Sequence, residues 1–237
     1  MKQMPALILA AGRGERMRPL TDRTPKPLLP VHGKPLIEWQ LEALARDGVR
    51  QVVINTAWLE EQFPATLGDG ARFGLSIRYS MEGRDHGGAL ETAGGIAKAL
   101  ALLQSDTFWV LAGDIHAPDF RFGAHCVCVT DFTASGDLAH LWLVPNPPQH
   151  PHGDFGLDPA GRLLAAADAR VITRYTYSTI GLFQSSLVAG VKRGEKSPLR
   201  PHLDAAIAQD RVGASLYTGR WADVGTPERW QELQDGS

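Results

Sequence analysis

Short apolar runs alternate with segments of helical periodicity along the first half of the chain. Apolar runs at 6–11, 51–55 and 108–112 predict strands that are buried on both faces. Apolar positions at helical spacing predict helices over 35–45 and 91–103. This alternation indicates right-handed βαβ units and a mostly parallel sheet, in which ligands bind at the carboxyl ends of the strands.

The second half of the chain is less regular and predicts a mixture of further strands and helices. Strands are expected over 138–144 and 212–217, additional sheet over 171–183, and helices over 201–209 and 227–233. No repeat or linker divides the chain. The pattern therefore predicts a single α/β domain over residues 1–237, a Rossmann-like three-layer sandwich around a mixed, mostly parallel sheet.

Composition narrows the classes of protein that need consideration. With 24 Lys+Arg against 26 Asp+Glu, the formal net charge is −2, which argues against nucleic-acid and anionic-membrane partners. No apolar run is long enough to cross a bilayer. Two cysteines cannot form a disulfide framework, so we expect a cytoplasmic protein.

A glycine-rich segment with several arginines follows the first strand directly. Gly12 and Gly14 allow the backbone to approach a ligand closely, and the free N–H groups of such a turn favour anions. Arg13, Arg16 and Arg18 add positive charge, which suits a polyphosphate. The segment lacks the Gly-Lys-Ser/Thr of a Walker motif and the third glycine of a dinucleotide fingerprint. The residues alone leave open a tight turn with solvated arginines.

Lys26 stands between two prolines, Pro25 and Pro27. Because proline fixes φ, this lysine is predicted to sit on a stiff, extended support. A rigidly held cation suits phosphoryl transfer, where positioning and electrostatics supply most of the catalysis. The alternative is a proline-rich surface loop with a solvated lysine.

Two aspartates follow apolar segments at positions far apart in the chain. Asp114 ends a buried strand, and Asp223 lies in a Trp-Ala-Asp-Val-Gly string that reads as a second strand end. Mg²⁺ takes one or two carboxylates and completes its shell with phosphate oxygens and water. From the residues alone, a metal pair and two helix-capping aspartates remain equally open.

Other polar clusters give weaker signals. The string His125-Cys126-Val127-Cys128 offers too few ligands at too close a spacing for zinc, so we expect a pair of buried, inert thiols. His150 and His152 flank a proline, and we expect them to be solvated rather than to touch a sugar phosphate.

The strings LAAGRGERMRPLT (9–21) and TPKPLLPV (24–31) together resemble the signature of the sugar-1-phosphate nucleotidyltransferases. The blocks ETAGGI, LVPNP, GDFGL and WADVGTPER follow in the order found in that family, so the resemblance covers nearly the whole chain. They are most similar to the bacterial N-acetylmuramate-1-phosphate uridylyltransferases, which serve cell-wall recycling. They are also similar to short mannose-1-phosphate guanylyltransferases.

The resemblance implies that a nucleoside triphosphate and a sugar 1-phosphate give a nucleotide sugar and pyrophosphate. It implies Mg²⁺ on Asp114 and Asp223, Arg16 on the β/γ phosphates, and Lys26 on the α-phosphate. The implied nucleotide contacts are Ala10, Ala11, Gly12, Arg13, Gly14, Glu82 and Thr92. The implied sugar-phosphate contacts are Gly94, Asp154, Gly156 and Thr179. The nucleotide would occupy the half at about 1–115, and the sugar phosphate the half at 116–237.

Three departures from the family bear on the sugar rather than on the reaction. Thr179 stands where the muramate branch tends to have glycine, which would narrow the space for a lactyl group. The segment 166–170 lacks the acidic-lysine pair frequent in the family, and 118–136 is unlike the helix usual there. Mannose-1-phosphate guanylylation and glucose-1-phosphate uridylylation or thymidylylation therefore remain alternatives.

Two further hypotheses do not involve that reaction. The protein could be a nucleotidyltransferase for another acceptor, such as phosphocholine or the molybdenum cofactor, or a sensor that binds a nucleotide sugar without turnover. A sensor would be expected to have lost Lys26, Asp114 or Asp223, and all three are present. A glycosyltransferase would usually show a D-x-D motif, which the string at 114–116 is not. No hexapeptide repeat is present, so a bifunctional enzyme is not expected.

Overall fold

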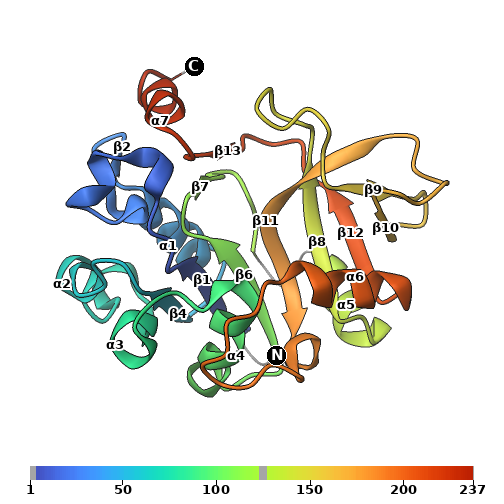
Figure 1. Cartoon of the computed structure of the whole chain (residues 1–237), viewed down its shortest axis with the longest axis horizontal. Helices are drawn as coiled ribbons and strands as arrows, with labels where there is room; N and C mark the ends of the chain where they lie inside the picture. The colour runs from blue at the N-terminus through green and yellow to red at the C-terminus, as the bar shows by residue number, and fades with distance from the viewer. Residues whose placement is uncertain (1–3, 123–126, 237) are drawn as a thin grey trace.

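A nine-stranded mixed sheet forms the centre of the molecule, as the computed structural model of the chain shows for residues 4–122 and 127–236 (Figure 1). The strands lie in the order β10-β9-β11-β6-β1-β4-β5, with β8 beside β11 and β12 beside β8. Their bounds are β1 Ala6–Ala10, β4 Gln51–Thr56, β5 Ser76–Met81, β6 Thr107–Ala112, β8 Ala139–Val144, β9 Phe155–Leu157, β10 Leu163–Ala165, β11 Arg174–Gln184 and β12 Val212–Leu216.

The first half of the sheet is wholly parallel. Strand β1 pairs with β4 on one side and with β6 on the other, and β5 pairs with the far side of β4. Antiparallel pairing enters where β11 joins β6, β8 and β9. The predicted α/β class with a mixed sheet is confirmed, and the carboxyl ends of β1, β4 and β6 meet at one edge as expected.

Helices cover both faces of the sheet. The helices α1 (Leu36–Arg46), α2 (Gln62–Leu67) and α5 (Val127–Ser135) contribute to an apolar cluster on one face, which includes Ile8 of β1. The helices α4 (Glu91–Leu103) and α6 (Arg200–Ala208) pack on the other face, against the alternate residue Leu7. Because successive side chains of a strand point to opposite faces, a strand that is apolar throughout serves both clusters. The predicted three-layer sandwich is therefore confirmed.

Strand β11 joins the two halves of the molecule and is irregular in its middle. Its register with β8 shifts between Tyr177 and Gly181. Within this bulge Thr179 has φ +63°, a left-handed conformation that β-branched residues rarely adopt. The buried Ser178 stabilises the bulge, because its hydroxyl donates to the carbonyl of Trp142. The bulge turns the chain at the edge where the candidate site lies.

Two short ribbons lie outside the main sheet. One pairs β7 (Ile115–His116) with β13 (Ala222–Asp223), and the other pairs β2 (Pro30–Val31) with β3 (Lys34–Pro35). The C-terminal helix α7 (Pro227–Gln234) follows β13 and lies beside β2 (Figure 1). Both ribbons are too short to show a periodicity in the sequence.

A small apolar cluster, which we call the small core, fills the space between these ribbons. Its buried members are Met17, Leu29, Val31, Leu36 and Val224. They are neighbours in space but come from three separate stretches of chain, around residues 17, 29–36 and 224. The small core thus holds together the segments that carry Arg16, Lys26 and Asp223.

The segment around Lys26 differs from the sequence prediction. Pro25 is extended, but Lys26–Leu28 form a 3₁₀ turn closed by the bond from the Leu28 N–H to the Pro25 carbonyl, 2.9 Å. The predicted extended support is wrong because the φ of proline suits a 3₁₀ turn as well as an extended chain. A short helix α3 (Glu82–His86) was also not predicted. The prediction for the thiols beside His125 lies outside the described residues and side chains.

Candidate active site

The glycine-rich segment leaves β1 at the sheet edge and turns into a 3₁₀ turn, Glu15–Met17. Gly14 has φ +68°, and a side chain there would meet Thr21, so the turn requires glycine. A Cβ on Gly12 would instead face open space. Arg13 stacks its guanidinium 4.4 Å from the ring centre of Trp58. Gly12 is thus the position where this loop presents bare backbone.

A buried hydrogen-bond chain supports the start of that loop from below. Asn55, at the end of β4, accepts from the Ala10 N–H at 2.7 Å and donates to Glu82 at 2.7 Å. The other Glu82 oxygen accepts from the N–H of Leu90 at 2.8 Å. Burial raises the pKa of the Glu82 carboxyl above its ordinary value. The chain ties together the ends of β1, β4 and β5 and the segment before α4.

Lys26 and Asp114 form an ion pair at the end of β6. The Lys26 ammonium lies 2.5 Å from the Asp114 carboxylate, and the lysine side chain is only 13% exposed. Pro27 packs beside Gly113, where an added Cβ would lie 3.1 Å from the proline ring. The lysine is therefore held against the strand end by its neighbour as well as by its charge.

Asp223 lies next to Asp114 although the two are far apart in sequence. In the β7–β13 ribbon Asp223 is paired with Ile115, and the N–H of Val224 donates to the Asp114 carbonyl at 2.8 Å. Both Asp223 oxygens accept from Arg229 Nη1 at 2.5 Å. Gln149 adds a third bond, at 2.7 Å. Each aspartate is thus neutralised by its own cation.

These charged groups face one open cavity of about 830 Å³. Arg16, Asp114, Asp223 and Arg229 all line it, together with His150. Its wall carries both positive and negative side chains. Such a wall suits a ligand that combines phosphate groups with a divalent cation.

A second cavity, of about 500 Å³, adjoins the first, because Asp114, Tyr177 and Thr179 line both. Its wall also includes Gly12, Lys26, Thr92 and Asp154. Thr92 lies in the first turn of α4, where the helix dipole favours an anion, although the N–H groups of Ala93 and Gly94 are already donated to the Ser197 carbonyl.

Asp154 is fixed at the wall of this second cavity by two hydrogen bonds. Its carboxylate accepts from the N–H of Tyr177 at 2.8 Å and meets His150 Nε2 at 3.0 Å. A carboxylate that is held in this way can accept from a ligand hydroxyl without reorganisation. The pair also shows that His150 is not simply solvated, contrary to the sequence prediction.

Seven predicted site residues line neither cavity: Ala10, Ala11, Arg13, Gly14, Glu82, Gly94 and Gly156. Glu82 is fully buried in the chain below the loop, and the Ala10 N–H is already donated to Asn55. Gly94 packs against the backbone of Glu195, and Gly156 packs against Val171. For these two glycines the structure gives close packing as the reason for the missing side chain.

Sequence reasoning did not place Gln149 and Arg229 at the site and set His150 aside as solvated, although all three line the 830 Å³ cavity. The position of Arg229 near Asp223 could have been predicted from the sequence. Thr226 caps α7 by accepting from the Arg229 N–H, so the arginine lies in the first turn of a helix that begins just after Asp223. Gln149 and His150 lie in a proline-rich loop whose path has no periodic signal.

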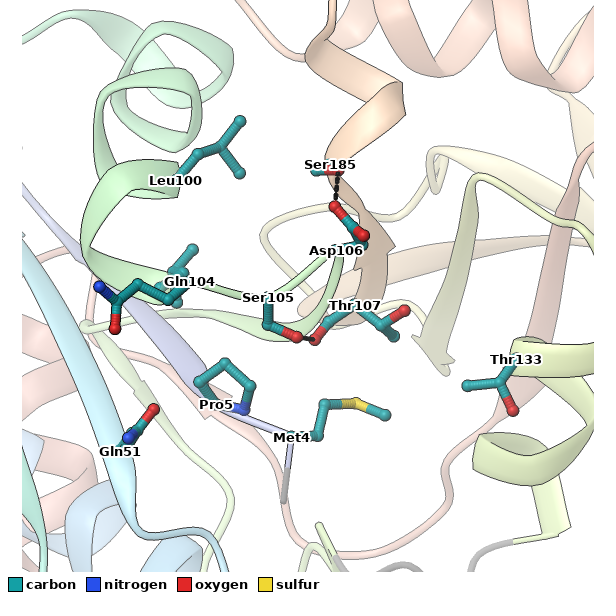
Figure 2. A pocket seen from close by; sticks show the side chains of 11 residues that line it. Met4, Pro5, Gln51, Leu100, Gln104, Ser105, Asp106, Thr107, Thr133 and Ser185 are labelled. Atoms are coloured by element: carbon teal, nitrogen blue, oxygen red, sulfur yellow. Dashed lines mark hydrogen bonds between the residues drawn. The ribbon is translucent and has the colours of Figure 1, made fainter. Parts of the chain in front are cut away.

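A further hollow, of about 740 Å³, lies at the opposite end of the sheet, beside the amino ends of β1, β4 and β6 (Figure 2). None of the predicted site residues lines it. Two of its polar side chains bond locally, Asp106 to Ser185 at 3.0 Å and Ser105 to the Thr107 carbonyl at 2.7 Å. This hollow is therefore separate from the chemistry at the carboxyl edge.

The two aspartates fit a magnesium ion by the nature and placement of their oxygens. Both carboxylates are partly exposed toward the same cavity, with side-chain exposures of 32% and 28%. Within the described residues no group of three or more His, Cys, Asp or Glu side chains could hold a metal. Mg²⁺ commonly binds to one or two carboxylates, and phosphate oxygens and water complete its coordination shell.

Comparison with known proteins agrees with this geometry. A family model described as nucleotidyl transferase matches residues 5–168, more than half of the chain. The chain belongs to the nucleotidyl transferase family. The family resemblance drawn from the glycine-rich loop and the Lys26 segment is thus confirmed, and the protein is an enzyme of nucleotidyl transfer.

Individual relatives cover nearly all of this nucleotidyltransferase. An N-acetylmuramate alpha-1-phosphate uridylyltransferase of Neisseria meningitidis is 46% identical over 98% of this chain and 97% of its own. A UTP–glucose-1-phosphate uridylyltransferase of Synechocystis is 43% identical over 98% of this chain but 63% of its own. A Bacillus anthracis structure described as a glucose-1-phosphate thymidylyltransferase shares the fold, with a TM-score of 0.79, 21% identity, and coverage of 98% and 94%. None of the described helices could span a membrane.

Proposed function

We propose that this nucleotidyltransferase joins UTP to N-acetylmuramate 1-phosphate, giving the nucleotide sugar and pyrophosphate. The observation that carries the reaction is the convergence of Arg16, Lys26, Asp114 and Asp223 on adjoining cavities. The choice of sugar is supported by the Neisseria meningitidis relative, which is matched over almost its whole length. A role in cell-wall recycling and a cytoplasmic location accompany that choice as predictions.

In the proposed reaction an oxygen of the sugar phosphate attacks the α-phosphorus of the nucleotide in line. A new P–O bond forms while the bond to the β-phosphate oxygen breaks, and pyrophosphate leaves. Asp114 and Asp223 would hold Mg²⁺, which when bound would neutralise phosphate charge and keep both substrates together. Lys26 would stabilise the charge that develops at the α-phosphate, and Arg16 would hold the departing pyrophosphate.

The rest of the site would position the two substrates. The nucleotide would lie in the half at about 1–115, with its base and ribose near Ala11 and Gly12. Glu82 would act through Asn55 and the Leu90 N–H rather than by contact, because it is fully buried. The sugar phosphate would occupy the half at 116–237, with Asp154 and Thr179 at its hydroxyls.

A second candidate substrate is glucose 1-phosphate. It is favoured by Thr179, which brings a branched side chain to the wall that both cavities share. A smaller sugar without a lactyl group would pass this wall more easily. The 43% identical Synechocystis relative carries that activity in its name.

A product assay tests both candidates. The protein is incubated with Mg²⁺, one of UTP, GTP or dTTP, and one of N-acetylmuramate, glucose or mannose 1-phosphate. Pyrophosphate release is followed, and the nucleotide sugar is identified by mass. We expect UDP-N-acetylmuramate as the main product. The preference for this sugar is refuted if glucose 1-phosphate reacts faster, and the reaction itself is refuted if no pair gives a product.

Two variants connect the assay to the site. Asp223→Asn is expected to lose product formation, because one carboxylate of the proposed metal pair is gone. The control Asp235→Asn changes an exposed aspartate near the C-terminus and is expected to behave as wild type. Equal rates for both variants would remove Asp223 from the mechanism.

A further inference from the structure

Gln40 is a buried amide on the side of α1 that faces the sheet. It is only 5% exposed, and it lies among apolar neighbours of the same helix, Ile37, Leu41 and Leu44. It lies beside the end of β6 and does not line the 830 Å³ cavity. A buried polar side chain in such a place is costly unless its hydrogen bonds are made.

The amide nitrogen of Gln40 bridges the two ends of the turn that carries Asp114. It donates to the carbonyl of Ala112 at 2.8 Å and to the carbonyl of Ile115 at 2.9 Å. These carbonyls stand two residues before and one residue after Asp114. A single side chain thus spans the turn and fixes the separation of its ends.

The orientation of this amide is determined by its partners. Both partners are carbonyl oxygens, which only the nitrogen can meet, and a flipped amide would place three oxygens together. The Gln40 oxygen is buried and makes no hydrogen bond within the described part of the chain. The side chain is therefore retained at a cost, for the sake of its two donors.

The remaining backbone groups of the turn are pinned from two other directions. The Gly113 N–H donates to the Leu9 carbonyl of β1 at 2.8 Å. The Asp114 carbonyl accepts from Val224, the residue after Asp223, at 2.8 Å. Gln40 supplies the third direction, and without it the segment between Ala112 and Ile115 would keep only the bonds to Leu9 and Val224.

We propose that Gln40 is a positioning residue for the divalent metal, because it holds the turn that aims the Asp114 carboxylate at Asp223. The inference rests on the proposed function, in which these two aspartates bind the ion. Residues that orient metal ligands without touching the metal commonly change metal affinity by about 10–100-fold when they are replaced. The prediction is that the loss of both donors weakens metal binding while the nucleotide itself still binds.

The test replaces Gln40 by methionine, which keeps the length and apolar packing but removes both donors. Binding of Mn²⁺ to the protein is followed, with a non-hydrolysable UTP analogue present, by the loss of the free-ion electron paramagnetic resonance signal that remains after subtraction of the loss caused by the analogue alone, which itself binds Mn²⁺. We expect the dissociation constant for Mn²⁺ to rise about tenfold. The affinity for the analogue measured in EDTA and the unfolding temperature are expected to change little. The matched control is Gln62→Met on α2, which removes the bond from the Gln62 amide to the Arg23 carbonyl.

A third variant separates this inference from the proposed function. Asp114→Asn is expected to abolish the Mn²⁺ signal change, and if it does not, the metal assignment itself fails. If Asp114→Asn abolishes binding and Gln40→Met leaves it at the wild-type value, only the role of Gln40 is overturned. If Gln40→Met does not fold, Gln40→Asn replaces it, since the shorter amide cannot reach both carbonyls.

Discussion

Replacing Thr179 by glycine is expected to stabilise the protein, although the substitution removes atoms. Its φ of +63° puts a β-branched residue in the left-handed region, which costs an L-residue about 1–2 kcal/mol. Glycine adopts that φ without cost but loses about 0.5–1 kcal/mol through the entropy of the unfolded chain. Among the described residues, the Thr179 hydroxyl bonds only to the preceding carbonyl, at the edge of an open cavity where water can replace that carbonyl as its partner.

Taken between the midpoints of these two ranges, the balance is a gain of about 0.75 kcal/mol in the free energy of unfolding, or roughly 1.5–3 °C in melting temperature for a chain of this size. Calorimetry of the two proteins at the same pH measures it. The control Thr173→Gly makes the same change at an exposed position without a positive φ and should lower the melting temperature. A melting temperature for Thr179→Gly below wild type, by as much as in the control, would refute the strain argument. The Thr179→Gly variant should also accept a bulkier sugar phosphate at a lower KM than wild type, because the wall shared by the two cavities loses a branched side chain.

Three further outcomes follow from contacts described above. Lys26→Met should lower kcat by a factor of about 10²–10³ with little change in KM for the sugar phosphate, because a preorganised cation is lost. Both constants are measured by pyrophosphate release, and a kcat within about twofold of wild type would contradict this prediction. Burial lowers the pKa of His140 to about 4, so this residue binds fewer protons in the folded state than in the unfolded state. Its contribution to stability therefore falls as pH drops from 6.5 toward 4, by at most about 1.4 kcal/mol per pH unit. His140→Gln should flatten that part of a urea-denaturation series, and an unchanged slope would exclude His140 as its source. Trp230→Phe removes the bond to the Pro30 carbonyl, 2.8 Å, and should cost about 1 kcal/mol by denaturation. A neutral result would show that this bond does not stabilise the docking of α7, which Gln234 also links to Pro30 and His32.

Much of the fold could be predicted because its central strands are apolar on both faces and its helices are periodic. The end of β6 was predictable in the same way, since an apolar run that stops at Gly113-Asp114 places a carboxylate at a parallel sheet's carboxyl edge. The pairing of Asp114 with Asp223 was not predictable from pattern, because the ribbon that joins them has only two residues in each strand. Backbone strain at Thr179 depends on a bulge, which is a property of two strands together.

Gln40 shows how a signal can be present and still be passed over. It lies three residues after Ile37 and four after Leu36, on the apolar stripe of a helix that otherwise reads as amphipathic. A polar residue on such a stripe indicates a buried hydrogen-bond partner, but the sequence does not say which carbonyl it meets. Arg229 is a similar case, because its partner is fixed only when the chain after β13 is placed.

The small core has a consequence for redesign of this enzyme. None of its buried members, Met17, Leu29, Val31, Leu36 and Val224, lines the 500 Å³ cavity, whose wall comes instead from β11, the loop before β9, α4 and α6 as well as the sheet edge. The apolar residues that support the phosphate-binding segments can therefore be kept unchanged while residues that contact the sugar are replaced. A library confined to Asp154 and Thr179 can explore new acceptors while the phosphate-handling groups keep their support.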